Sequence, residues 1–235
     1  SFLQASLGSR PDIDLNSYYI LALNQEANIT VIDPLLGYGS SKLLTLVFLK
    51  SPGEDWVLSR DRRRLFVSMP LVNQVAVVDT ANWKVVTNLD VGARPTRLAM
   101  QPDEKYLWVG NDAPGESGDG SGVTVIDTAE LKVAARLLTG AGHHELAFTA
   151  DDRYAFVTNQ TAGTLSIIDV PKLAKIKDLR TGPAPVSLAF SPLSQAVYVA
   201  DEVDGAVTVI DRQSREISAR LKTEPGLKAI RLTPD

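Results

Sequence analysis

The sequence predicts an all-β protein, a β-propeller built from four-stranded antiparallel blades. One observation is a repeat: a pentapeptide such as Val123-Thr-Val-Ile-Asp127 recurs along the chain. The aspartates that close its copies stand 46, 48, 42 and 42 residues apart, at Asp33, Asp79, Asp127, Asp169 and Asp211. The other is that each repeat holds four short runs of β-branched and aromatic residues, separated by Gly, Pro, Asp and Asn. A period of about 40–45 residues with several strands per repeat is typical of propellers.

The repeat around Tyr154 shows what each run does. Residues 145–149 and 154–158 are apolar enough to be buried on both sides, and residues 164–168 form the third strand. Residues 174–179 alternate charged and apolar positions, as an outer strand facing water should. Blades of this kind pack radially and bury both faces of each small sheet.

The repeats divide the chain in order. Residues 1–16 match no repeat and are expected to be an N-terminal arm, and residues 17–235 form one propeller domain. Residues 18–22 look like the second strand of a blade whose first strand is missing; residues 29–32 and 42–48 continue that blade. Complete blades begin near residues 55, 96, 145 and 186.

Residues 228–232 begin a further blade, which leaves two interpretations of the ring. If this strand pairs with residues 18–22, it completes the split blade and closes a five-bladed ring. The alternative is that the chain is a fragment of a seven-bladed ring. The sequence leaves both open.

Several motifs carry a family resemblance. Phe156-Val-Thr-Asn159 ends a second strand, with looser forms at 108–111 and 198–201, and Gly-x-x-Pro stands at 92–95 and 182–185. In these motifs the chain resembles the YVTN-repeat β-propeller family (YncE-like). The resemblance implies a propeller in a bacterial protein located in the periplasm or outside the cell. It implies no particular activity, because propellers carry many unrelated functions.

Composition excludes several classes of function. The net charge is −4 with both signs interspersed, so no basic surface for nucleic acid is indicated. The longest apolar run, residues 43–49, is far shorter than the roughly 20 residues of a membrane-spanning helix. The absence of cysteine excludes disulfides, thiolate metal sites and covalent c-type haem attachment within this chain. No known catalytic motif is present, so the sequence indicates neither catalytic residues nor a cofactor.

The two histidines are adjacent, at His143 and His144, and are followed by Glu145. His143 stands where neighbouring repeats have Pro95 and Pro185. In a four-stranded blade, the loop before the first strand and the loop between the second and third strands lie on the same face, so these residues should lie at the channel mouth. An imidazole there could bind a metal, a haem iron or a carboxylate, or move a proton. The alternative is an ordinary surface or packing role, and adjacent histidines on a strand point to opposite sides.

The same topology adds residues of neighbouring blades to this binding face, namely Arg97, Asn111, Asn159 and Asp201. The long loop 111–122 should lie beside them, as a partner-binding lid or a simple linker. Three of its carboxylates are weak candidates for a hard cation such as Ca²⁺: Asp112, Glu116 and Asp119. The repeated aspartates at the ends of the third strands are interpreted as turn caps.

Two hypotheses of function follow. The first is a non-enzymatic propeller scaffold that binds a protein partner or a small molecule on the face carrying His143. The second is an oxidoreductase or a haem- or cofactor-handling propeller in which His143 is the axial ligand. Neither involves nucleic acid or a membrane span.

Overall fold

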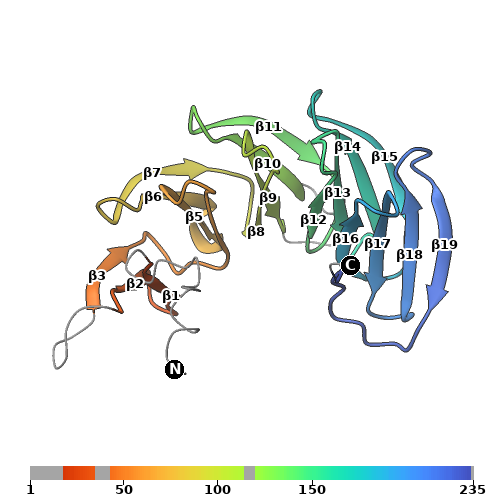
Figure 1. The fold of residues 1–235 in the computed structure, drawn as a ribbon, viewed down its shortest axis with the longest axis horizontal. Helices are drawn as coiled ribbons and strands as arrows, with labels where there is room; N and C mark the ends of the chain where they lie inside the picture. Colours follow the sequence, from red (N-terminus) through yellow and green to blue (C-terminus); the bar gives the residue numbers. More distant parts are fainter. Residues whose placement is uncertain (1–17, 35–42, 114–119, 234–235) are drawn as a thin grey trace, which may run out of the picture.

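The computed structural model describes residues 18–34, 43–113 and 120–233. They form five antiparallel sheets that stand side by side along an arc (Figure 1). Four sheets have four strands and the first has three. The prediction of a β-propeller with four-stranded blades is confirmed.

Each sheet is one blade, numbered here in chain order. Blade 1 contains β1 (Ile20–Leu23), β2 (Asn28–Ile32) and β3 (Leu43–Phe48). Blade 2 contains β4 (Trp56–Leu58), β5 (Arg64–Met69), the 3₁₀ turn η1 (Pro70–Val72), β6 (Gln74–Asp79) and β7 (Lys84–Asp90). Blade 3 contains β8 (Pro95–Met100), β9 (Tyr106–Asn111), β10 (Gly122–Asp127) and β11 (Lys132–Leu138). Blade 4 contains β12 (Leu146–Phe148), β13 (Tyr154–Asn159), β14 (Thr164–Asp169) and β15 (Ala174–Arg180). Blade 5 contains β16 (Pro185–Ser191), β17 (Ala196–Asp201), β18 (Ala206–Asp211) and β19 (Ile217–Lys222).

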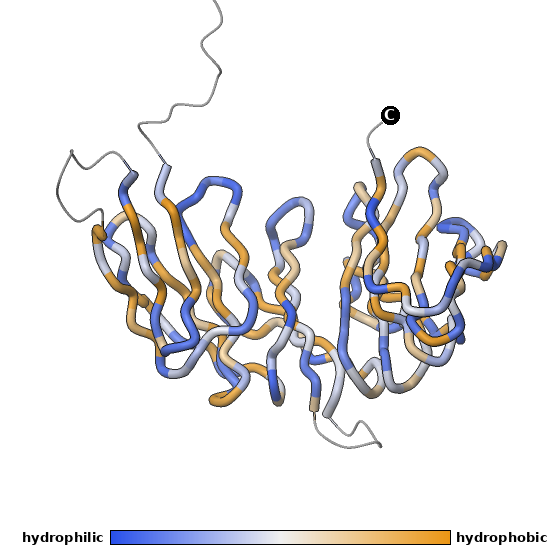
Figure 2. The backbone as a smooth tube through the Cα atoms, turned by 90° about the horizontal axis from the view of Figure 1, so that it is seen from below, coloured by the Kyte–Doolittle hydropathy of each residue, from blue (hydrophilic) through white to orange (hydrophobic). Residues whose placement is uncertain are grey.

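The hydrophobic core lies between the blades rather than inside one layer. Strand β9 shows how: Leu107 and Val109 pack into the core shared by blades 2 and 3, while Trp108 packs into the core shared by blades 3 and 4. Successive side chains of a strand point to opposite faces, so a middle strand that is apolar at every position serves two cores. Figure 2 shows the blades side by side with hydrophobic residues along their strands. The outermost strands are largely exposed: β11 alternates exposed and half-buried residues, and β19 is exposed at every position.

The pairing that would close a five-bladed ring is not formed in the described part of the chain. Residues 228–232 are not in a strand, and β1 pairs only with β2. The chain leaving β19 is instead held to its own blade, because Thr223 N and Gly226 N donate to Gly205 O and Glu202 O, each at 2.7 Å. Ile230 N then donates to Ser187 Oγ of β16 at 3.2 Å. This segment therefore lies beside blade 5, while blade 1 stands at the other end of the arc (Figure 1).

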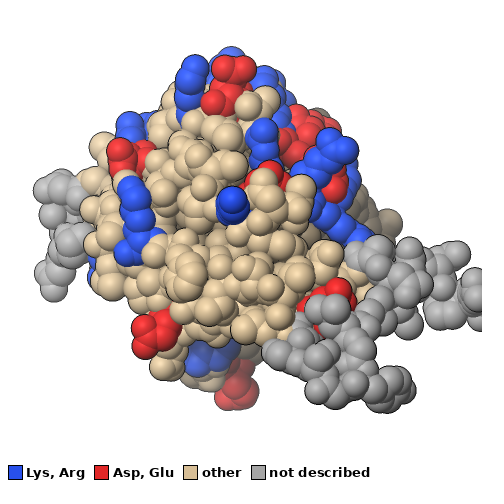
Figure 3. All heavy atoms as spheres, turned by 90° about the vertical axis from the view of Figure 1, so that its left-hand side faces the viewer, with Lys and Arg blue, Asp and Glu red and all other residues tan. Residues whose placement is uncertain are grey.

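The end of the arc that carries blade 1 presents a broad surface with few charges (Figure 3). Exposed apolar side chains of this blade include Tyr19, Leu44 and Phe48, and Phe48 is 72% exposed. The sheet of blade 1 shares a core with blade 2 on one side only. Among the described residues, no core cluster lies on its other side.

Candidate functional site

The two faces of the arc differ in the loops that form them. The histidine face carries the loops before the first strands and the loops between the second and third strands. The turn face carries the hairpin turns between the first and second strands and between the third and fourth strands. His143 lies on the histidine face, before β12, as the repeat topology predicts.

On this face, the side chains at one equivalent position of successive repeats form a row of alternating charge. The residues at this position in blades 2, 3 and 4 are Asp55, Arg97 and Glu145. Arg97 Nη1 lies 3.3 Å from Asp55 Oδ2, and Arg97 Nε lies 3.1 Å from Glu145 Oε2. Asp55 Oδ2 also accepts the backbone N–H of Leu98 at 2.8 Å. One guanidinium thus joins three successive blades.

His143 adds a second bridge to this row. Its Nδ1 lies 2.9 Å from Asp112 Oδ2, and its Nε2 lies 3.5 Å from Glu145 Oε1. Asp112 follows β9, and its Oδ2 also accepts the hydroxyl of Thr96 at 2.6 Å. The register of β8 against β9 shifts between Pro95 and Arg97. Thr96 is the extra residue of this bulge, and bulges of this kind re-aim side chains.

The electrostatics fix the charge of His143. Its hydrogen bond to Asp112, then that to Glu145, raises its pKa from 6.5 to about 9, against the opposing effect of burial. His143 is therefore an imidazolium at neutral pH. Both of its ring nitrogens are engaged by carboxylates.

His144 has the opposite environment. It is fully buried, and burial lowers its pKa. Its Nδ1 donates to Thr158 O at 2.9 Å, because a carbonyl only accepts, and its Nε2 lies 3.0 Å from Ser121 Oγ. The two histidines thus point to opposite sides, and His144 does not reach the surface.

Three residues assigned to the binding face from the sequence are buried instead: Asn111, Asn159 and Asp201 are at most 2% exposed. Each lies against a glycine of its own blade where a Cβ would not fit; the glycines are Gly92, Gly140 and Gly182. Their side chains tie loops together. Asn159 Nδ2 donates to Ser166 Oγ at 3.0 Å, and Asp201 Oδ2 accepts the N–H of Ala184 at 2.6 Å. They are the last residues of β9, β13 and β17, and the sequence pattern does not show that their side chains point inward.

The cation site suggested for loop 111–122 gains no support from Asp112. This carboxylate is bound by Thr96 and His143, and Glu116 and Asp119 lie outside the described residues. No group of three or more His, Asp or Glu side chains in the described ranges has the arrangement of a metal site. In the His143 cluster the two ring nitrogens point to different carboxylates and do not converge on one point.

Sequence reasoning missed Asp55 and Thr96. Asp55 could have been found, because aligning the repeats on their first strands puts it at the same position as Arg97 and Glu145. Opposite charges at one repeat position in successive blades indicate contact between blades. Thr96 carries no such signal, because its role depends on the bulge.

The more exposed part of the arrangement is cationic, although its two cations face three carboxylates. The side chains of Arg97 and His143 are 38% and 37% exposed, whereas those of the three carboxylates are 17–23% exposed. The cations therefore form the outer layer, and the carboxylates behind hold them in place. Guanidinium and imidazolium groups donate charge-assisted hydrogen bonds to carboxylates.

A comparison with known families identifies the fold family. The sequence profile of the Cytochrome D1 heme domain matches residues 15–180. The chain belongs to this family. The prediction of a β-propeller family is confirmed, whereas the YVTN-repeat family is not the one that matches. No curated protein matches the chain.

Two solved structures share the architecture of this Cytochrome D1 heme domain protein. Hydrazine synthase of Kuenenia stuttgartiensis superposes with a TM-score of 0.68 at 16% identity, over 94% of this chain and 70% of that one. The dihydro-heme d1 dehydrogenase NirN in complex with DHE superposes with a TM-score of 0.66 at 19% identity, over 86% of this chain. The superposition covers 44% of the NirN chain, so this chain spans less than half of its length. At these identities the likeness shows the fold.

No helix long and apolar enough to cross a membrane occurs in the part of the chain that the structure describes.

Proposed function

We propose that this chain binds a haem-type tetrapyrrole on its histidine face, and that Arg97 and His143 contact acidic groups at the edge of the macrocycle. Family membership favours this function over a non-enzymatic scaffold. The observation that carries it is the exposed cationic pair, backed by Asp55, Asp112 and Glu145, at the predicted channel mouth. A bound haem supplies an iron for redox or ligand-binding chemistry.

His143 fits this group as a charged residue at its edge, and neither histidine fits as an iron ligand. Iron binding needs a neutral imidazole with a free nitrogen lone pair. His143 is protonated at neutral pH and both its nitrogens are held by carboxylates. His144 is neutral, but it is buried and both its nitrogens lie within hydrogen-bond distance of protein groups. The hypothesis that His143 is an axial ligand therefore gains no support from the geometry.

Cationic edge contacts have a definite role in such a site. Haem carries carboxylate side groups. The half-exposed guanidinium of Arg97 would donate to such a group, and His143 would add positive charge beside it, because both of its ring nitrogens are already held by carboxylates. Asp112 keeps His143 protonated, and Glu145 holds both cations. Arg97 and His143 would thus orient the macrocycle, and neither histidine would supply the iron ligand. An extracytoplasmic location and a relationship to YVTN repeats, drawn from Phe156-Val-Thr-Asn159, remain part of this proposal.

Titration with hemin, followed by absorption spectroscopy, tests the proposal. We expect the wild type to bind hemin saturably. The variant R97Q/H143Q should bind at least tenfold more weakly, and H143Q should leave the position of the Soret band unchanged. Arg136→Gln is the control for lost charge, because Arg136 lies on the outer strand β11, where its guanidinium donates to the carbonyl of Asp90. It should bind as the wild type does.

Two results would contradict the proposal. Absence of saturable hemin binding by the wild type would refute tetrapyrrole binding by this chain. A shifted Soret band in H143Q would show that His143 is an iron ligand and would refute its role at the edge.

A further inference from the structure

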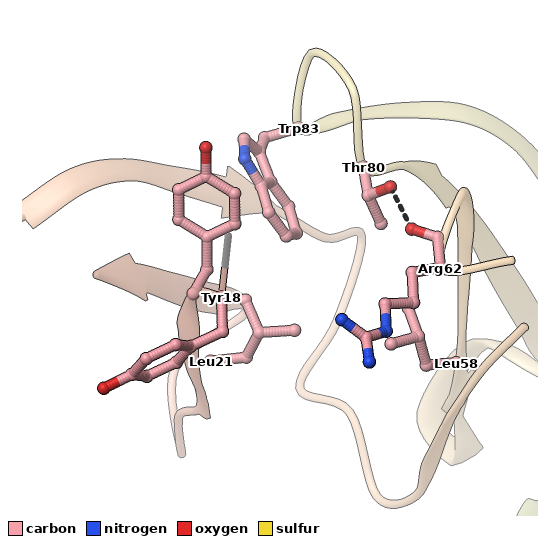
Figure 4. Close-up of a pocket in the computed structure, with 7 residues that line it drawn as sticks. Tyr18, Leu21, Leu58, Arg62, Thr80 and Trp83 are labelled. Carbon is pink, nitrogen blue, oxygen red and sulfur yellow. Dashed lines mark hydrogen bonds between the residues drawn. The ribbon is translucent and has the colours of Figure 1, made fainter. Parts of the chain in front are cut away.

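The turn face has cavities at three junctions between blades. The cavity between blades 1 and 2, of about 330 Å³, is lined largely by apolar and aromatic side chains (Figure 4). Tyr19 and Trp83 meet there edge to face, with ring centroids 5.4 Å apart. A second cavity, of about 280 Å³, lies between blades 2 and 3. The cavity between blades 4 and 5 is the largest, at about 430 Å³. It is lined by Arg153, Tyr154, Gln195, Asp211, Arg212 and Gln213.

Two arginines at this third cavity depart from the repeat. The residue directly after the third-strand aspartate is threonine or valine in blades 2 to 4 and Arg212 in blade 5. The residue four positions after that aspartate is Trp83, Leu131 or Leu173 in blades 2 to 4 and Arg215 in blade 5. All four of the latter residues have positive φ, between 46° and 58°. The backbone of this turn therefore has the same conformation at this position in blades 2 to 5, while the side chain at the position differs.

In blades 2 to 4 the second of these positions holds an apolar residue. Trp83, Leu131 and Leu173 each pack against the core between their own blade and the preceding or following one. Arg215 lies instead against the ring of Tyr154, which packs against the core between blades 4 and 5. Leucine occupies the same position in blades 3 and 4, so the turn itself does not require an arginine.

Both arginines converge on one aromatic ring. The guanidinium carbons of Arg153, Arg212 and Arg215 lie 5.5, 6.0 and 5.7 Å from the ring centroid of Tyr154. Arg215 Nη1 also donates to the hydroxyl oxygen of Tyr154 at 2.9 Å. Arg153, then Arg215, lowers the pKa of Tyr154. The hydroxyl is therefore a stronger proton donor toward the cavity than that of an ordinary tyrosine.

Cationic side chains outnumber carboxylates around this cavity. Arg153 pairs with Asp169 at 3.0 Å, and Arg212 pairs with Asp151. Among the described residues Arg215 contacts no carboxylate within 4.0 Å, and Arg212 Nε is buried without a hydrogen-bond partner. Lys172 adds a fourth cation near Asp169, while Asp211 is the third carboxylate. The cavity thus carries uncompensated positive charge and unused donors.

We propose that the cavity between blades 4 and 5 binds the carboxylate or phosphate group of a small organic anion. A guanidinium presents a planar fork of donors that matches the oxygens of either group. Arg153, Arg212 and the hydroxyl of Tyr154 line the cavity and provide these donors, while Arg215 supports the tyrosine from behind. The site is on the opposite face from His143 and does not depend on the proposed tetrapyrrole binding.

The repeat itself supplies the variants for the test. Arg212→Thr and Arg215→Leu restore the residues that other blades use, so the double variant should fold. Arg220→Leu is the control for lost charge: it removes one of the two charges that the double variant loses, from the exposed strand β19 of the same blade. Isothermal titration with inorganic phosphate and, separately, with succinate measures binding to each protein.

We expect saturable binding of at least one probe to the wild type, and the tighter probe identifies the group that the site prefers. The double variant should bind at least tenfold more weakly, and the control should stay within twofold. Equal affinities of the wild type and the double variant, or no saturable binding of either probe by the wild type, would overturn the proposal.

A measurement on the wild type covers the case in which the double variant does not fold. Absorbance at alkaline pH follows tyrosine ionisation. Saturating succinate should raise the apparent pKa of the tyrosine that ionises first, because a bound anion disfavours the nearby phenolate. An unchanged titration curve would contradict the site.

Discussion

Deprotonation of His143 should weaken the folded state of this chain. In the folded protein its pKa is raised from 6.5 to about 9, first by Asp112 and then by Glu145. The unfolded chain binds the same proton only below about pH 6.5. The stabilisation is therefore fully present below pH 6.5, declines as the pH rises toward 9, and is absent above the folded pKa.

The structure bounds the size of this effect. The difference between the two pKa values corresponds to roughly 3 kcal/mol if nothing screens it. The His143 side chain is 37% exposed, so solvent and salt weaken both ion pairs. The net contribution is then about 1 kcal/mol. In a chain of this size, that shifts the unfolding midpoint by about 2–4 °C.

Urea unfolding of the wild type and of His143→Gln at about pH 6, 8 and 10 measures the effect. The wild type should exceed the variant by about 1 kcal/mol near pH 6, and the difference should vanish near pH 10. The chain has two histidines, so their NMR signals can be assigned by one substitution. The His143 signal should titrate near 9, and that of His144 below 6.5. A pH-independent difference, or a His143 signal that titrates near 6.5, would refute this reasoning.

Two further predictions concern the fold. Gly182→Ala should lower the free energy of unfolding by about 1–3 kcal/mol, because the added Cβ would stand 2.3 Å from Asp201 Oδ2. Gly140→Ala should lower it less, because its Cβ would lie 3.0 Å from the Asn159 side chain. Thermal unfolding of both variants checks this order, and equal costs would contradict the close packing of these glycines. Truncation after Gly226 should shift the unfolding midpoint by less than about 2 °C. The described residues beyond Gly226 are mostly exposed, and they are held to blade 5 chiefly through Ser187 and Glu202. A large loss of stability in a melting experiment would instead favour a closed ring.

The sequence by itself determined the blades. Strand positions follow from runs of apolar residues, and turns follow from residues whose side chains bond their own backbone. Asp79 and Asp127 illustrate this, because each accepts the backbone N–H two residues later at 2.9 Å. Interactions of this kind span a few residues, so a repeat of about 40 residues contains all the information for one blade. The position of His143 in the loop before β12 followed from the same local pattern.

Only the tertiary structure decided how the blades meet. Asp55, Arg97 and Glu145 stand 42 and 48 residues apart, and their contact depends on radial packing rather than on local pattern. The tertiary structure also gives the two adjacent histidines different protonation states. Carboxylates keep His143 charged, while desolvation keeps His144 neutral. The partner of residues 228–232 was likewise undecided, because apolar strands of equal length can pair with several edges. Contacts between blades and differences in burial, which no single repeat encodes, therefore determine the site.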